Sequence, residues 1–124
     1  MLQENGFRPQ RESVGRINLN GSQSEHLREL EYKRLRVRSS GSGDAILEGT
    51  VGELEIEVSG SATIDARDLK TKITTIDSSG SGTIYAHASK EFRIDASGSG
   101  KIHLYGNGEI TSKDLSGSTK VFKH

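Results

Sequence analysis

Four carboxylates recur at nearly equal spacing in this sequence, and carboxylates held at a fixed spacing are groups that could bind a cation. Each stands two residues before a Ser-Gly-Ser triplet, so each occupies the same position in a repeat. On stacked strands they would lie about 5 Å apart, where like charges repel. Ion pairs with Arg38 or Arg93 would relieve that repulsion, and so would a hard cation such as Ca²⁺, which prefers oxygen ligands. We call these residues the acidic ladder: Glu57, Asp77, Asp95 and Asp114.

Aromatic and imidazole side chains gather in the last three copies of the same repeat. They stand six and eight residues after the first serine of each triplet, and residues two apart share a face of a strand. One outer face would thus hold half of the six aromatic residues and three of the four histidines. Such a face suits stacking on a sugar ring, a partner protein or a second copy, and the histidines suit a transition metal. Alternatively, the rings are simply good cross-strand neighbours. The residues are Tyr85, His87, His103, Tyr105, Phe122 and His124.

Nothing in the sequence points to catalysis. A nucleophilic serine requires a nearby base and donors for an oxyanion, and the surroundings of the serine triplets supply neither. The GxxxxGKS, HExxH and GxSxG signatures are absent. A sugar-cleaving enzyme needs two carboxylates about 5 to 10 Å apart around a cleft, whereas a regular row on a flat face forms no cleft. We therefore expect no enzyme and no organic cofactor.

A tandem repeat must position these side chains. Its marker is the Ser-Gly-Ser triplet, and successive first serines are separated by 19, 20, 18 and 19 residues. A degenerate sixth copy begins at Asn20, twenty residues before the first of them. The period is too short for helical-hairpin repeats, which need more than about 30 residues, and it suits one coil of a parallel β-solenoid. The marker serines are Ser40, Ser59, Ser79, Ser97 and Ser116.

Apolar and polar residues alternate on both sides of each triplet, which is the pattern of strands with one buried face. Positions one, three and five residues before the marker, and five and seven residues after it, are mostly apolar. These five columns are predicted to face inward. The exceptions, Glu25, Lys113 and Lys123, fall in the terminal copies, where a solenoid must become polar to stay soluble.

The triplets themselves are predicted to turn the chain at the corner between two strands. Glycine accepts a positive φ without steric cost, so we expect the corner glycines to adopt one. The flanking serines can bond nearby backbone groups. Stacked on successive coils, their hydroxyls could form a ladder in which each bond adds about 1 kcal/mol.

These patterns predict an all-β fold, a parallel β-helix or β-solenoid with about six coils of roughly 19 residues and Ser-Gly-Ser-Gly corners. We expect a single solenoid domain over residues 14–124. Residues 1–13 contain the only proline and follow no period, so they are predicted to form a flexible tail. Residues 24–35 fit either a short helix beginning at Ser24 or a further coil, and the regular spacing favours the coil.

Composition limits the classes of function. The 17 basic and 17 acidic side chains give no net charge, which argues against nucleic-acid binding, because that requires a basic surplus. With no cysteine, disulfides and thiolate metal sites are excluded. No run of 18 apolar residues exists, so no transmembrane segment is expected. The start lacks the apolar segment of a secretory signal, so either the protein is not exported or its signal has been removed.

A family resemblance rests on RVRSSGSGDAILEG (36–49), LEIEVSGSATIDARDLK (54–70), IDSSGSGTIYAHAS (76–89) and IDASGSGKIHLYGN with the closing LSGSTKV (94–121). With these stretches the chain resembles the head GIN domain family of auto-transporter adhesins. Ala62 and Thr119 depart from the usual Ser-Gly-Ser-Gly. The resemblance implies a parallel β-helical domain, exported to the periplasm or cell surface of bacteria, and it implies no catalytic residues.

We therefore expect a non-catalytic binding module or adhesin of the bacterial envelope. Its partner would be a glycan or a protein on the ring-bearing face, and not a nucleic acid. The alternative is a self-assembling scaffold in which solenoids stack end to end, as in bactofilin-type polymers, because solenoid ends expose unpaired strand edges. Against that alternative, Lys113, Lys120 and Lys123 and a polar first coil resemble edge protection.

Overall fold

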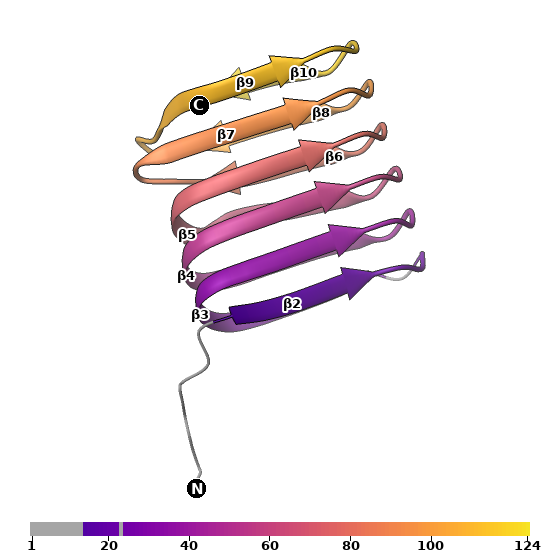
Figure 1. Ribbon diagram of the computed structural model, residues 1–124. Coiled ribbons are helices and arrows are strands. Elements are labelled where there is room, and N and C mark those ends of the chain that lie inside the picture. The colour runs from indigo at the N-terminus through magenta and orange to yellow at the C-terminus, as the bar shows by residue number, and fades with distance from the viewer. Residues whose placement is uncertain (1–13, 23) are drawn as a thin grey trace, which may run out of the picture.

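The computed structural model describes residues 14–22 and 24–124, and within them the chain forms parallel strands and no helix (Figure 1). Each coil stacks on the one before it, as the sequence predicts. The strands are β2 (Val14–Leu19), β3 (Glu25–Ser39), β4 (Asp44–Val58), β5 (Thr63–Ser78), β6 (Thr83–His87), β7 (Glu91–Ala96), β8 (Lys101–Tyr105), β9 (Glu109–Leu115) and β10 (Lys120–Lys123).

The strand register confirms a solenoid of about six coils. Ile17 lies beside Val37, Val37 beside Ile56, and Ile56 beside Ile76, so each strand pairs with the equivalent strand of the next coil. Residues 24–35 belong mostly to β3, and the choice of a coil over a short helix is therefore confirmed.

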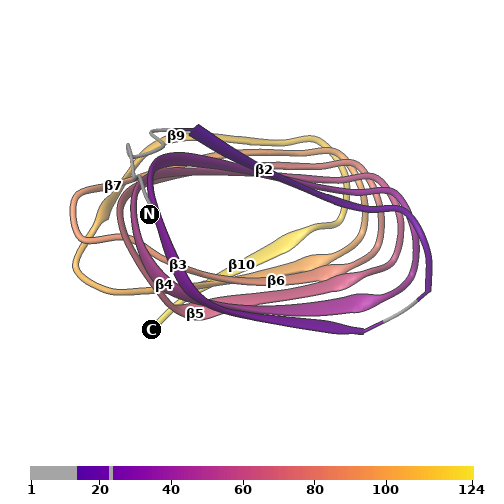
Figure 2. The same ribbon diagram turned by 90° about the horizontal axis from the view of Figure 1, so that it is seen from below.

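The coils have two flat walls, which meet at the Ser-Gly-Ser corner on one side and at a second bend on the other (Figure 2). Wall 1 contains the strands that lead into the corner: β2, β7, β9 and the C-terminal halves of β3, β4 and β5. Wall 2 contains the strands that leave it: β6, β8, β10 and the N-terminal halves of β3, β4 and β5. β4 stays continuous through the second bend, where Gly49 adopts a φ of 145°.

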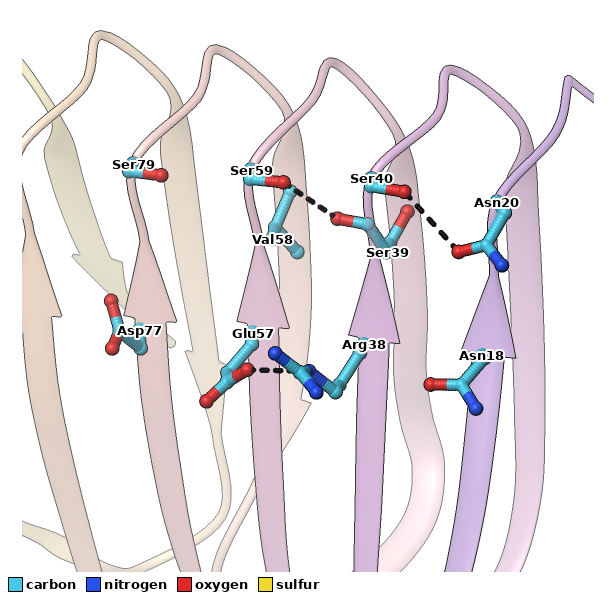
Figure 3. Close-up of a pocket in the computed structure, with 10 residues that line it drawn as sticks. All are labelled: Asn18, Asn20, Arg38, Ser39, Ser40, Glu57, Val58, Ser59, Asp77 and Ser79. Carbon is cyan, nitrogen blue, oxygen red and sulfur yellow. Dashed lines mark hydrogen bonds and ion pairs between the residues drawn. The ribbon is translucent and has the colours of Figure 1, made fainter.

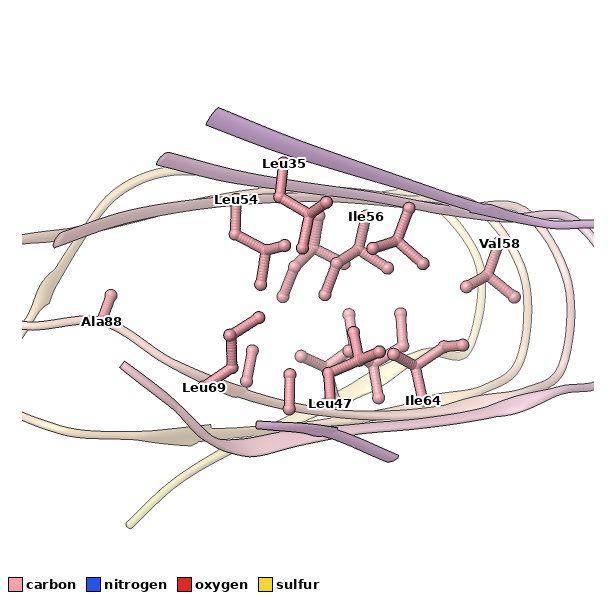
Figure 4. Close-up of a cluster of buried hydrophobic side chains, with 14 of the residues drawn as sticks. Leu35, Leu47, Leu54, Ile56, Val58, Ile64, Leu69 and Ala88 are labelled. Atoms are coloured by element: carbon pink, nitrogen blue, oxygen red, sulfur yellow. The ribbon is translucent and has the colours of Figure 1, made fainter. Parts of the chain in front are cut away.

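The core fills the space between the walls with branched aliphatic side chains (Figure 4). Leu35, Leu54 and Ile56 of wall 1 face Leu47 and Ile64 of wall 2, and all five are buried. In the middle coils the five inward columns are buried, which confirms the predicted alternation. The exceptions predicted for the terminal coils are exposed: Glu25, Lys113 and Lys123.

The corner glycines have a different role from the one predicted. None of them has a positive φ, so that prediction is wrong. They are needed because successive corners lie directly on one another: a Cβ on any of them would overlap the backbone carbonyl oxygen of the corner glycine one coil earlier. Gly21 starts the column, and nothing lies within 4 Å of a Cβ placed there. The stacked members are Gly41, Gly60, Gly80, Gly98 and Gly117.

The corner serines also bond differently from the prediction. Backbone amides donate to carbonyls of the preceding coil at the described corners, so the parallel ladder continues around the turn. The Ser40 hydroxyl donates to the Asn20 side-chain oxygen at 3.2 Å, and the Ser59 hydroxyl lies 3.4 Å from the Ser39 carbonyl oxygen. The expected serine-to-serine ladder is therefore not formed in the described part of the chain.

Two further expectations concern the N-terminal tail and membrane-spanning segments. The predicted tail, residues 1–13, lies outside the described residues. Among residues 14–22 and 24–124 no helix has the length and apolar character needed to cross a membrane.

Candidate functional site

Five of the six predicted ring residues form one stack that runs along wall 2. The register places Tyr85 beside His103 and His103 beside Phe122. Their ring centroids are 4.8 and 4.9 Å apart, with planes inclined by 14° and 16°. In the next column Tyr105 and His124 stack at 4.6 Å and 10°, and His103 Nδ1 lies 3.0 Å from His124 Nε2. We call these five residues the ring stack.

Arg67 extends the ring stack into the preceding coil. Its guanidinium carbon lies 4.7 Å from the centre of the Tyr85 ring and 6.0 Å from that of Tyr105, which is cation–π geometry. Arg67 also donates to both carboxylate oxygens of Asp65, at 3.0 and 2.7 Å, and these hydrogen bonds lower the pKa of Asp65. Arg67 is not among the residues predicted from the sequence, although it stands eight residues after Ser59, in the same column as His87 and Tyr105.

The stack presents ring edges to a ligand, because most ring faces are already covered. His103 lies between Tyr85 and Phe122, and Arg67 lies over Tyr85 from the preceding coil. A sugar that stacks on an aromatic residue needs an open ring face, so the stacking expected from the sequence has no place inside the stack. Tyrosine hydroxyls and imidazole nitrogens at the edges are hydrogen-bonding groups. The arrangement therefore suits polar recognition.

His87 lies beside the ring stack and not in it. Its register partner is Tyr105, but no stacked ring pair in the described chain includes His87. Its Nδ1 atom is buried without a hydrogen-bond partner. Burial, and then the charge of Lys70, lowers the pKa of His87. Its backbone carbonyl accepts hydrogen bonds from the hydroxyls of Thr71 and Thr74 inside the coil. These contacts favour a role for His87 in shaping the second bend.

The acidic ladder is stacked in register on wall 1, but only its first member pairs with arginine. The Cα partners run through all four members. Arg38 Nε lies 2.8 Å from a Glu57 carboxylate oxygen, as expected. Arg93 pairs with Glu91 instead of with the ladder. No ion pair found in the described chain involves the last three members.

Calcium binding by the ladder stays a prediction. Among residues 14–22 and 24–124, no group of three or more His, Asp or Glu side chains is arranged to hold a metal ion. A cation that bound only the folded chain would raise the melting temperature in millimolar calcium relative to chelator. An unchanged melting temperature would end the hypothesis.

Replacing Asp77 by Asn is expected to raise the melting temperature at pH 7. Burial first, and then the charges of Asp95, Glu57 and Glu55, raise the pKa of Asp77, so the folded chain disfavours its charged form. That cost is present above the raised folded pKa and disappears once the pH falls below the ordinary value of 3.8. We expect a gain of about 1–3 °C at pH 7 and none near pH 3, measured by calorimetry.

The exposed Asp68 lies outside the ladder and provides the control substitution, Asp68→Asn. It should change the melting temperature equally little at both pH values. A gain for Asp77→Asn that persisted at pH 3 would show that the cost of the charged Asp77 carboxylate, from burial and from its acidic neighbours, is not the cause.

Three ion pairs occupy the N-terminal part of wall 1. Outward arginines of β3 face outward glutamates of β4, with N–O distances of 3.4, 2.7 and 2.8 Å. Each side chain is at least 36% exposed, so each pair contributes only about 0–1 kcal/mol. Their charges cancel within the pairs, which leaves little for a charged ligand. The pairs are Arg34–Glu53, Arg36–Glu55 and Arg38–Glu57.

A polar groove of about 400 Å³ follows wall 1 where it meets the corners (Figure 3). Several of its polar groups already bond to one another, namely Ser40 with Asn20 and Arg38 with Glu57. Asp77 lies at one end of the row without a bond to the residues drawn. The sequence reading identified these columns but not the groove, because the groove depends on how sharply the wall bends into the corner.

Comparison with known proteins identifies the family to which most of the chain is similar. The family model described as "Putative auto-transporter adhesin, head GIN domain" matches residues 11–108. The matched range includes β2 to β8 and therefore most of the solenoid. The name of that family suggests an adhesin-like surface domain. No curated protein matches the chain.

Proposed function

The chain belongs to the head GIN family of auto-transporter adhesins, and from that premise we propose that it is a non-catalytic binding module of the bacterial cell envelope or surface. Residues 14–124 would act as one solenoid domain that presents the ring stack to a partner. The periplasm and the cell surface are the compartments that fit this role.

The observation that carries the proposal is the ring stack itself. Tyr85 stacks on His103 and on Arg67, Tyr105 stacks on His124, and Tyr85, His103 and Tyr105 are half-buried on adjacent strands. Side chains that are ordered before binding lose little further rotamer freedom when a partner arrives. Exposed aromatic groups gathered on one face of a soluble domain commonly mark interaction sites. No comparable group of rings was found elsewhere in the described chain.

The carboxylates support a non-catalytic role. Glycoside hydrolysis needs two carboxyl groups on opposite sides of a bound sugar. On wall 1 the acidic ladder instead forms a single row along one sheet, and Glu57 is engaged by Arg38. A row of this kind has no room for a sugar between an acid and a nucleophile.

Replacing Tyr85 and Tyr105 together by Ser is expected to abolish binding. The change removes both hydroxyls and the rings that hold His103 and His124 in place. The test is retention of the purified chain on immobilised neutral and acidic glycans and on intact bacterial cells. Tyr85→Phe with Tyr105→Phe should weaken binding less, because it keeps the rings and removes only the edge hydroxyls.

The matched control changes wall 1: Arg36→Ser with Glu55→Ser removes an exposed ion pair without touching the ring stack. Melting curves establish that all variants fold. Binding that survives Tyr85→Ser with Tyr105→Ser but is lost in the wall 1 control would refute the proposal.

End-to-end assembly is the second candidate, because β2 and β10 are edge strands of the described sheet. Parallel edges of this kind invite pairing with another copy. Lys113 and Lys123 oppose it, since they occupy inward columns of the last coil and are exposed. We therefore expect one species of about 13.4 kDa in sedimentation velocity over a hundredfold range of concentration. Growth into large species would favour the scaffold.

A further inference from the structure

Charge is divided between the two walls at the C-terminal end of the solenoid, although the whole chain is neutral. On wall 1, β7 and β9 contain four carboxylates and two basic residues. On wall 2, β6, β8 and β10 contain no carboxylate, and their side chains include Lys101, Lys120 and Lys123 besides the histidines. The face that holds the ring stack is therefore the basic face of this end of the molecule.

Two of these lysines border the ring stack directly. Lys101 and Lys120 are register partners on β8 and β10, and both are exposed. They stand two residues before His103 and Phe122, on the same outer face of their strands. Side chains two residues apart on a strand are about 7 Å from each other. A single sugar unit can span that distance, so one ligand can reach a lysine and a ring edge together.

The carboxylate that precedes the stack in register is already neutralised. Asp65 is the partner of Tyr85 in the preceding coil and accepts two hydrogen bonds from Arg67. It therefore does little to offset the charges of Lys101 and Lys120. The Arg67–Asp65 pair therefore adds no net charge beneath Tyr85, and the basic character of this face comes from the lysines.

We propose that this face of β6, β8 and β10 binds an acidic polysaccharide. The inference rests on the proposed function and names the class of ligand for the same surface. Carboxylates of the glycan would pair with Lys101 and Lys120, and sugar hydroxyls would bond to the tyrosine and histidine ring edges. A polymer laid along the solenoid axis would meet cations on successive coils about 4.8 Å apart.

Other partners fit this face less well. A neutral sugar held by stacking needs open ring faces, and most ring faces are covered within the stack. A membrane needs a broad apolar surface, whereas the large apolar side chains exposed in the described chain are only Val14, Ile46 and Phe122. A nucleic acid needs a larger basic surplus and free rings for its bases.

The test compares polygalacturonate with its fully methyl-esterified form, which has the same sugar backbone without the charge. Binding of the intact chain is measured by calorimetric titration at low and moderate salt. We expect the esterified polymer to bind at least tenfold more weakly, and affinity for the charged polymer to fall as salt rises.

Two double variants test whether Lys101 and Lys120 provide the electrostatic part of the affinity. Lys101→Gln with Lys120→Gln should weaken binding of polygalacturonate at least tenfold. Lys33→Gln with Lys72→Gln makes the same charge change at exposed positions away from the stack and should leave affinity within twofold. Equal binding of both polymers, an unaffected Lys101/Lys120 variant, or no binding of polygalacturonate at millimolar sugar would overturn the inference.

The result also separates this inference from the function on which it rests. If the esterified polymer binds equally well and Tyr85→Ser with Tyr105→Ser abolishes that binding, the acidic ligand class is wrong and the binding surface stands. If the tyrosine variant binds either polymer as the parent chain does, the proposed function fails too.

Discussion

Replacing Gly98 by Ala should lower the melting temperature by about 10 °C or more. The new Cβ would overlap the Gly80 carbonyl oxygen, which accepts a hydrogen bond from the Ser99 amide. Backbone cannot rotate away as a side chain can, so the two coils must separate at the corner. Overpacking in a core typically costs about 1–3 kcal/mol, and we expect at least the upper figure here. The measurement is thermal unfolding followed by far-ultraviolet circular dichroism.

Gly21→Ala is the matched control. Gly21 occupies the same position in the first coil, where nothing lies within 4 Å of an added Cβ. The identical substitution should change the melting temperature by no more than about 2 °C. If both variants lost stability equally, glycine would be required for the shape of each corner and not for the stacking of one corner on the next.

Replacing Phe92 by Ala should destabilise the chain by about 3–5 kcal/mol. Phe92 is the largest fully buried side chain of the described core and lies inward on β7, between Thr74 and Ile110 in the register. Truncation leaves a cavity in the core, and the neighbouring coils can relax into it only in part. We expect the midpoint of urea unfolding to fall with an unchanged slope.

Phe122→Ala tests the same truncation at an exposed position. Phe122 is 39% exposed and contacts His103 through one ring face. It should cost about 1 kcal/mol, because an aromatic pair contributes roughly 0.5–1.5 kcal/mol. A smaller loss for Phe92→Ala than for Phe122→Ala would contradict the placement of Phe92 in the core.

Much of the fold could be predicted because the repeat and the strand alternation act together. A period near 19 residues fixes which residues lie beside one another, so the sequence alone places His103 next to Tyr85 and Phe122. Alternation then fixes which columns face inward, and Leu54 and Ile56 lie where that pattern puts them. Both signals depend only on spacing, which the sequence contains in full.

The reason for the corner glycines could not be read in the same way. A glycine is compatible with a positive φ and with close backbone approach, and one sequence does not separate the two. Gly98 is required by the position of Gly80, eighteen residues earlier, and that contact exists only once the coils are stacked. Gly49, which does have a positive φ, lies at the second bend and outside the triplets.

The candidate site was predictable in membership but not in orientation. Spacing grouped Tyr85, His103 and Tyr105 on one face, but it contains no information on ring planes. The rings stack face to face along the solenoid axis. Their edges, and not the open faces expected for sugar stacking, are therefore available to a ligand. Arg67 was not predicted because only aromatic and imidazole residues were considered. It nevertheless stands in the same column as His87 and Tyr105.

The most direct test of the binding surface is a map of amide chemical shifts in the labelled chain during titration with polygalacturonate. The proposal under test is that the C-terminal end of wall 2 binds an acidic polysaccharide. We expect the largest changes in Thr83–His87, Lys101–Tyr105 and Lys120–Lys123. Largest changes along the polar groove of wall 1, or no changes at saturating polymer, would contradict it.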